Sequence, residues 1–136
     1  MAVRFKSHGE FTVRAEGRLL ISEAFGPWNK ELVEQWAGAL FVLAKPLGGY
    51  VGISVVRGSM LCPPDALVAL HAAISYGGAR LQCLGNALVA AADVEGRTLL
   101  LPTYEKLYDP EPPHGIFLDL ESARAWGLAL LAQAGF

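Results

Sequence analysis

The first part of the chain alternates apolar and polar positions and then changes to a helical spacing. Phe11 to Glu16 alternates with a period of two, and residues 18–25 again have the composition of a strand. Glu16-Gly17 supplies a turn between the two segments. The pattern therefore predicts an antiparallel hairpin, whose second strand ends at Gly26-Pro27.

The next segment has the features of an amphipathic helix. Asn29 is expected to cap it, because an Asn side chain can accept a hydrogen bond from a backbone N–H of the first turn. Trp28, just before the cap, is expected to pack on Val33. One apolar stripe is formed by Leu32, Val33, Trp36, Leu40 and Leu43. Pro46 and Gly48-Gly49 are expected to end this helix.

The middle of the chain predicts a buried strand followed by a second helix. Tyr50 to Val56 is a continuous, β-branched apolar run, which is typical of a central strand covered by helices on both faces. The second helix is expected to place on one face Leu67, Leu70, His71 and Ile74. We expect Gly77-Gly78 to end that helix, and we expect His71 to be a core or half-buried histidine.

The remainder repeats the alternation of strand and helix. Short strands are predicted at Ala87 to Ala92 and at Ile116 to Leu118. A third helix carries Leu99, Leu100, Tyr104, Leu107 and Tyr108, with Pro102 either kinking or starting it. A last helix carries Ala123, Trp126, Leu130 and Leu131.

The resulting order is β-β-α-β-α-β-α-β-α over a chain of 136 residues. Strands that alternate with helices predict an α/β fold with a mostly parallel sheet, to which the leading hairpin adds one antiparallel strand. We expect about five strands and four helices, in a single domain that spans residues 1–136.

Composition adds an expectation about partners. Hydrophobic residues make up 53% of the chain and charged residues only 18%, whereas an average soluble domain has roughly 25% charged residues. This low charge favours a protein that is covered by a partner or forms a homodimer. The net charge is −2 and no basic cluster occurs, which disfavours nucleic acid as a partner.

Targeting and cofactor signals are weak. The apolar runs are shorter than the ~18 residues of a membrane span, and the first residues lack the apolar segment of a signal peptide, so we expect a cytoplasmic protein. Cys62 and Cys83 are then expected to be reduced thiols. His8, His71 and His114 are scattered and dinucleotide or P-loop motifs are missing, so neither a metal nor a cofactor is expected.

Candidate chemistry gathers where the predicted strands end. In open α/β sheets, ligands bind outside the carboxyl ends of the parallel strands. Four predicted loops meet at this edge, at residues 26–29, 57–62, 93–97 and 119–122. As residues that bind a ligand or a partner there, we single out Trp28, Asn29, Arg57, Ser59, Cys62, Asp93 and Arg97.

Cys62 leaves two alternatives open. If Pro63 is the first helical residue, Cys62 is the N-cap, and the helix dipole lowers the pKa of its thiol. Otherwise Cys62 is a small, partly buried residue that caps weakly. A disulfide with Cys83 is not expected, because a helix of roughly 13 residues, about 20 Å long, separates the two. A thiol or hydrolytic enzyme would also need a base, and no histidine is predicted at this edge.

Short motifs along nearly the whole chain match one family. They are His8-Gly9 with Phe11, Gly26-Pro27 with Asn29, Leu61 with Pro63 and Asp65, and Phe117 with Ala125-Trp126. With this order of elements, the chain resembles the STAS-like anti-sigma-factor antagonists, and more closely their small bacterial STAS/Sec14-like branch.

The resemblance implies a STAS-like sandwich and a non-enzymatic role. Regulatory STAS proteins act through a phosphorylated serine at the start of the second helix, where this chain has Cys62-Pro63-Pro64-Asp65. The nearest serine, Ser59, lies three residues earlier, so the phosphoserine switch is expected to be missing. The resemblance then implies a module that binds a protein partner or, in a Sec14-like manner, carries a small apolar ligand or lipid.

Overall fold

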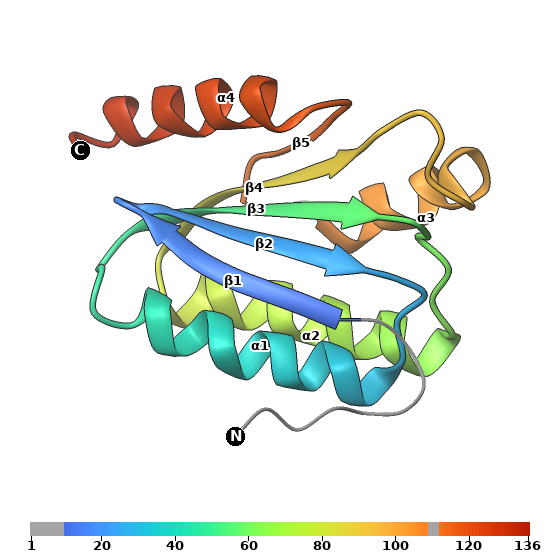
Figure 1. Ribbon diagram of the computed structural model, residues 1–136. Coiled ribbons are helices and arrows are strands. Elements are labelled where there is room, and N and C mark those ends of the chain that lie inside the picture. Colours follow the sequence, from blue (N-terminus) through green and yellow to red (C-terminus); the bar gives the residue numbers. More distant parts are fainter. Residues whose placement is uncertain (1–9, 109–111) are drawn as a thin grey trace.

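The computed structural model describes residues 10–108 and 112–136 (Figure 1). The strands are β1 (Glu10–Glu16), β2 (Leu19–Phe25), β3 (Tyr50–Arg57), β4 (Cys83–Ala90) and β5 (His114–Phe117). The helices are α1 (Lys30–Ala44), α2 (Pro64–Arg80), α3 (Arg97–Tyr108) and α4 (Leu120–Gln133). His8 and Gly9, which contribute to the family resemblance, lie outside the described residues.

The strands form one five-stranded sheet in the order β1-β2-β3-β4-β5. β1 is antiparallel to β2, and the pairs β2-β3, β3-β4 and β4-β5 are parallel. The predicted α/β class, the order of elements and the single antiparallel strand are therefore confirmed. The carboxyl ends of β2 to β5 consequently lie at one edge of the sheet.

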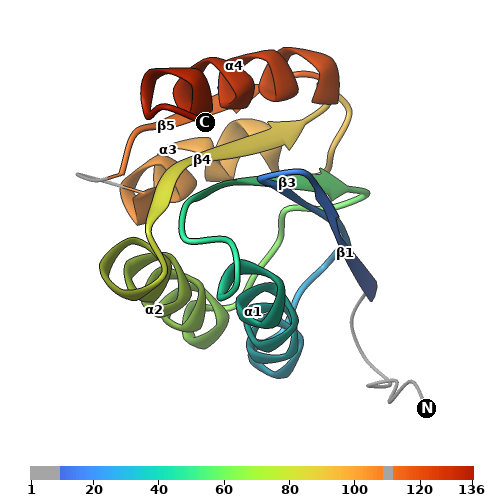
Figure 2. The ribbon, with the colours of Figure 1, turned by 90° about the vertical axis from the view of Figure 1, so that its left-hand side faces the viewer.

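The sheet separates two helical layers of unequal size. Figure 2 shows α4 alone on one face and α1 and α2 on the other. Val51, Ile53 and Val55 of β3 pack with residues of α4, whereas Tyr50 packs with residues of α1 and α2. Residues of α3 join those of α2 in a cluster that includes Leu88. The prediction that Tyr50 to Val56 forms a central strand covered on both faces is thus confirmed.

Helix α1 follows its sequence pattern. The side chain of Asn29 accepts a hydrogen bond from the backbone N–H of Leu32 at 2.9 Å, which confirms the predicted cap. The stripe is buried except for Leu43, which is partly buried. On this stripe the indole N–H of Trp36 donates to Ser22 Oγ at 2.8 Å, which fixes α1 to β2.

Helix α2 differs from the prediction at both ends. Its N-cap is Pro63 rather than Cys62, and the helix continues through Gly77 and Gly78 to Arg80. Neither glycine has a positive φ; the chain turns instead at Gln82, with φ 60°. Gly77 serves close packing, because a Cβ atom there would lie 2.7 Å from the hydroxyl oxygen of Tyr50. A glycine pair can therefore indicate a tight helix contact as well as a helix end.

His71 is exposed, so its predicted place on the buried stripe is wrong. The buried residues of α2 are Ala66, Ala73, Ile74 and Gly77. This face is rotated away from His71 because α2 packs against both α1 and Tyr50 through small residues.

In α3, Pro102 lies inside the helix. No helix in residues 10–108 or 112–136 is both long and apolar enough to cross a membrane.

Candidate functional site

Backbone hydrogen bonds join the first two loops at the carboxyl edge. The N–H of Gly26 donates to the carbonyl of Arg57 at 3.2 Å, and the N–H of Trp28 donates to the carbonyl of Leu61 at 3.1 Å. The loops are so close that a Cβ atom at Gly26 would collide with the main-chain oxygen of Ser59. The position of Trp28 is therefore fixed by the loop that follows β3.

The loop after β4 extends this arrangement. The N–H of Met60 donates to the carbonyl of Glu95 at 2.8 Å, and the N–H of Glu95 donates to the carbonyl of Gly58 at 2.9 Å. The hydroxyl of Tyr104, from α3, donates to the carbonyl of Met60 at 2.8 Å. Three loops and α3 thus hold the segment before α2 in one conformation.

An open groove lies between the first two loops, where α1 and α2 begin. Its volume is about 430 Å³, and we call it the edge groove; its lining residues are Pro27, Trp28, Asn29, Leu61, Cys62 and Pro63. The lining includes no charged side chain. Leu61 is 39% exposed and presents an apolar surface to solvent. The structure therefore brings together three of the predicted site residues here, namely Trp28, Asn29 and Cys62.

A small cavity, the inner cavity, lies beneath the edge groove. Its volume is about 40 Å³. Trp28, Leu61 and Cys62 line both spaces and separate them. Its other lining residues are Ser22, Ala24, Val33, Trp36, Ser54, Val56, Ser59, Leu70, Leu88, Tyr104 and Tyr108.

A second cavity, of about 20 Å³, adjoins the inner cavity. The two share the side chains of Ser22, Trp36, Ser54 and Tyr108. The second cavity extends under the sheet toward the start of β4, where Asn86 and Cys83 line it. Two neighbouring cavities thus lie inside the protein, one beneath the edge groove and one near the start of β4.

The environment of Cys62 opposes ionisation of its thiol. Burial raises the pKa of Cys62 to about 11, a hydrogen bond with Tyr104 lowers this pKa, and the nearby charge of Asp65 raises it. Cys62 is not the N-cap of α2, so the position that the first alternative requires is not the one it has. The structure supports the second alternative, a partly buried cysteine. Cys62 and Cys83 are both free thiols.

Ser59 is buried, and its hydroxyl oxygen accepts a hydrogen bond from the N–H of Leu61 at 3.1 Å. Its side chain also lines the inner cavity. The serine nearest to the start of α2 therefore lies inside the protein, where it shapes the loop before the helix.

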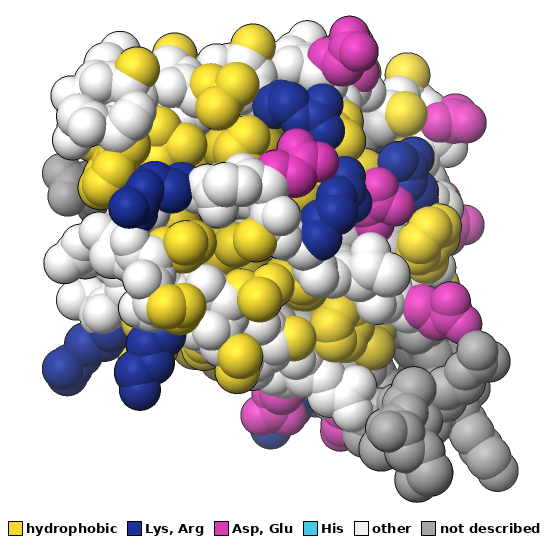
Figure 3. All heavy atoms as spheres, turned by 60° about the vertical axis from the view of Figure 1, so that its left-hand side comes forward, with side chains coloured by type: hydrophobic (Ala, Val, Ile, Leu, Met, Phe, Trp, Pro, Cys, Tyr) yellow, Lys and Arg dark blue, Asp and Glu magenta, His cyan; other side chains and the backbone are white. Residues whose placement is uncertain are grey.

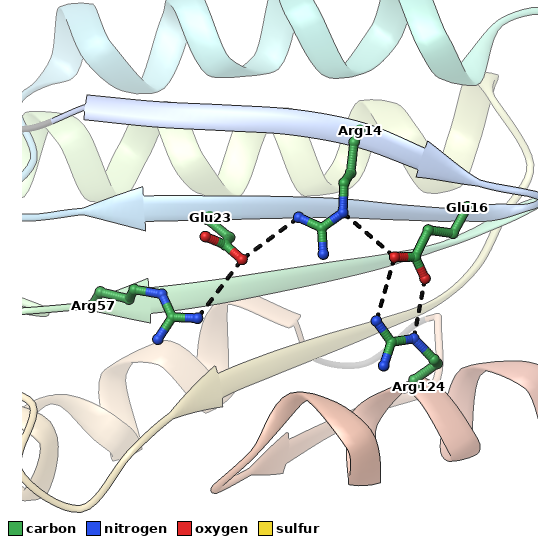
Figure 4. A network of polar contacts seen from close by, with 5 residues as sticks. All are labelled: Arg14, Glu16, Glu23, Arg57 and Arg124. Atoms are coloured by element: carbon green, nitrogen blue, oxygen red, sulfur yellow. Dashed lines mark hydrogen bonds and ion pairs between the residues drawn. The ribbon is translucent and has the colours of Figure 1, made fainter.

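Arg57 lies apart from the edge groove. Its guanidinium is 3.7 Å from a carboxylate oxygen of Glu23, on the sheet face where α4 lies. Figure 4 shows how the contacts continue from Glu23 to Arg14, from Arg14 to Glu16 and from Glu16 to Arg124 of α4. Arg57 alternates with Val56 along β3, which sends its side chain to the opposite face from the inner cavity. The sequence proximity of Arg57 to Cys62 does not bring their side chains together.

The last two predicted site residues also lie outside the edge groove. The guanidinium of Arg97 donates to the carbonyl of Ala90 at 2.9 Å, which holds the end of β4 against the start of α3. Asp93 is exposed and lines a hollow beside α4, together with Arg57. In the fourth loop, Asp119 caps α4 by accepting from the N–H of Ser122 at 2.8 Å.

The interior polar residues were missed by the sequence analysis. Ser22 and Ser54 interrupt apolar runs in β2 and β3, and Asn86 does so in β4. A polar side chain inside a strand that is covered on both faces needs a hydrogen-bond partner or a cavity. A polar residue within an apolar strand run was therefore the sequence signal for these interior cavities. No group of three or more His, Cys, Asp or Glu residues is arranged to hold a metal within the described ranges.

Comparisons with known proteins yielded no match among protein-family models, curated proteins or solved structures.

Proposed function

We propose that this protein is a non-enzymatic binding module that docks an extended segment of a protein partner in the edge groove. The observation that carries the proposal is the groove itself, an uncharged apolar depression of about 430 Å³ between two loops that hydrogen bonds hold together. Open α/β sheets bind their ligands at this edge. The role agrees with what the resemblance to STAS-like proteins implies.

The openness of the groove favours a protein segment over a small apolar ligand or lipid. Small-molecule sites bury 70–90% or more of the ligand surface and typically enclose ~300–1,000 Å³. The inner cavity has a volume of only about 40 Å³, so a lipid carrier in the Sec14-like manner receives less support. A bound peptide can bury one face in an open groove and leave the other in water.

A thiol-dependent enzyme also receives little support. The raised pKa of Cys62 keeps the sulfur protonated at neutral pH, whereas the thiolate is the nucleophile. His71 projects from the exposed side of α2, and the ring of His114 stacks on Tyr108. Neither histidine lines the edge groove or the inner cavity.

A peptide library displayed on phage tests the docking proposal without knowledge of the partner. We expect selection on the wild-type protein to enrich peptides with a shared apolar motif. Leu61→Asp should abolish their binding, because it places a charge in the uncharged groove. Leu128→Asp is the matched control, since Leu128 is 52% exposed on α4, on the far side of the sheet.

Calorimetry then measures the dissociation constant of one enriched peptide for the wild-type protein, Leu61→Asp and Leu128→Asp. A dissociation constant that rises at least tenfold for Leu61→Asp and less than twofold for Leu128→Asp supports the edge groove. Equal effects of the two substitutions, or failure to enrich any motif, would contradict the proposal.

Self-association is a second candidate, because the outer sides of α1 and α2 carry few charges. Residues 35–44 and 66–79 contain no Lys, Arg, Asp or Glu, and Val42 and Val68 are exposed. Figure 3 shows basic and acidic side chains in a band across the upper half of one side of the molecule, with hydrophobic side chains exposed between this band and the charged side chains at the lower edge. Sedimentation at micromolar concentration separates the two: a monomer that still binds the selected peptide leaves only the docking role.

A further inference from the structure

Two hydroxyl groups face the interior cavities without a protein partner. Tyr108 is only 5% exposed, and its hydroxyl makes no hydrogen bond to the described residues. Ser54 is only partly buried although β3 is the central strand, because its side chain lines both cavities. Tyr104 differs, since its hydroxyl donates to the carbonyl of Met60. Both hydroxyls line the cavities and are therefore available as hydrogen-bond partners for a molecule inside them.

Two further donors lie in the walls of the same space. Nε1 of Trp28 and Nδ2 of Asn86 are buried and have no hydrogen-bond partner in residues 10–108 and 112–136. Trp28 lines the inner cavity and Asn86 lines the second cavity, so the two donors lie toward opposite ends. The interior therefore holds unused hydrogen-bonding capacity along its length, surrounded by apolar side chains.

The size of the space limits what it can hold. A cavity needs roughly 10–15 Å³ to hold one water molecule. The inner cavity, at about 40 Å³, thus has room for three or four water-sized groups. A molecule of about four non-hydrogen atoms fits this volume, and a lipid chain does not.

The lack of charged side chains in the lining restricts the ligand further. No Lys, Arg, His, Asp or Glu side chain lines either cavity. An ion placed there would be buried without a counter-charge, which is strongly unfavourable. Burial raises the pKa of Tyr108, so its phenol remains a hydrogen-bond donor at neutral pH. The lining therefore fits a neutral molecule that carries an acceptor.

We propose that the two cavities form a binding site for a small neutral molecule of about four non-hydrogen atoms, such as a short ketone or alcohol, whose oxygen hydrogen-bonds to the hydroxyls of Ser54 and Tyr108. The molecule reaches the site from the edge groove, past Trp28, Leu61 and Cys62, which separate the groove from the inner cavity. This site goes beyond the docking role, because it lies beneath the groove and takes a different ligand.

Acetone is the probe, and the indole N–H signals of the tryptophans report on binding in ¹H–¹⁵N correlation spectra. Trp28 and Trp36 line the inner cavity, whereas Trp126 packs against Phe117 on the other sheet face. We expect the signals of Trp28 and Trp36 to shift saturably with a dissociation constant on the order of millimolar, while the Trp126 signal stays unchanged. Acetate has the same number of non-hydrogen atoms and carries a charge, so it should bind at least tenfold more weakly at pH 7.

Variants of the two hydroxyls identify the contact. Tyr108→Phe should weaken acetone binding about fivefold, which corresponds to the loss of one hydrogen bond, and Ser54→Ala should have a similar effect. Tyr76→Phe is the matched control, because Tyr76 is exposed on α2. Ala24→Val, which adds volume at the wall of the inner cavity, should reduce binding without removing a polar group.

The proposal is overturned if the three indole signals move together and linearly, if acetate binds as tightly as acetone, or if Tyr108→Phe and Ser54→Ala leave the affinity unchanged. The first outcome would show a general solvent effect of acetone in place of binding in the cavities. The acetone measurements on Tyr108→Phe and Ser54→Ala are independent of the peptide measurement, because Tyr108 and Ser54 line the two cavities and not the edge groove. Loss of one activity can therefore be distinguished from loss of the other.

Discussion

The main-chain oxygen of Ser59 occupies the position that a side chain at Gly26 would need. This contact brings the loop after β2 against the loop after β3 and so places Trp28 beside Leu61. The edge groove exists in its present shape because residue 26 has no Cβ atom.

Gly26→Ala should therefore destabilise the protein by roughly 1–3 kcal/mol, since the added atom meets rigid backbone. Gly38→Ala is the control: Gly38 is exposed on α1 with nothing within 4 Å of a Cβ atom, so this change should stabilise by up to ~1 kcal/mol. Urea denaturation measures both. Equal stabilities of the two variants would show that the loops separate without cost.

Tyr104 and Tyr108, both in α3, allow a matched comparison in which only the hydroxyl group is removed. Tyr104→Phe removes the hydrogen bond to the carbonyl of Met60, so a loss of about 1–3 kcal/mol is expected. Tyr108→Phe removes a hydroxyl that has no partner in the described residues and should change stability by less than ~0.5 kcal/mol. The difference between the two free energies of unfolding is the decisive quantity, and a reversed order would contradict the assignment of these hydroxyls.

Alkylation of Cys62 by iodoacetamide should be slow at neutral pH. A pKa of about 11, compared with an ordinary value of 9.0, lowers the thiolate fraction about a hundredfold. Mass spectrometry on native protein should then show a rate at least tenfold below that of free cysteine, rising as the pH approaches 11. Cys62→Ser leaves only the buried Cys83 as the control for background reaction. Modification as fast as free cysteine would restore the reactive-thiol alternative.

Stability should decline in alkaline solution. Burial raises the pKa of Cys62, Cys83, Tyr50 and Tyr104 above their ordinary values of 9.0 and 10.0. Between these values and the folded-state pKa values, the folded protein holds more protons than the unfolded chain. The free energy of unfolding therefore falls as pH rises. Urea denaturation from pH 8 to pH 11 should show the decline beginning near pH 9, and Cys62→Ser should make it shallower. A flat profile would contradict the burial of these groups.

Glu16 should titrate below its ordinary pKa of 4.5, because Arg124 and Arg14 hydrogen-bond to its carboxylate. The interaction with Arg124 is the larger cause. In Arg124→Gln the pKa of Glu16 should rise toward 4.5, while in Arg18→Gln, which leaves the contacts of Figure 4 intact, it should not change. Carboxyl-carbon NMR measures the pKa directly. An unchanged value in Arg124→Gln would mean that α4 and β1 do not interact in solution.

The sequence by itself determined the order of the elements, because each depends on a local pattern. The alternation before Gly17, the Asn29 cap and the apolar run from Tyr50 act over a few residues, and all three occur as expected. The gathering of Trp28, Asn29 and Cys62 at one edge followed from the rule that parallel strands end together. The helix end predicted at Gly77-Gly78 was the exception. Gly77 lies inside α2, and a glycine is needed there because Tyr50 of β3 packs against it.

Only the tertiary structure decided which side chains share a space. Arg57 and Cys62 are close in sequence but lie on opposite faces of the sheet, because strand parity sends Arg57 to Glu23. Cys62 meets Tyr104, which is distant in sequence, and is buried enough to raise its pKa. The inner cavity combines residues from Ser22 to Tyr108. A cavity is the space left after distant side chains have packed, and no local pattern specifies that remainder.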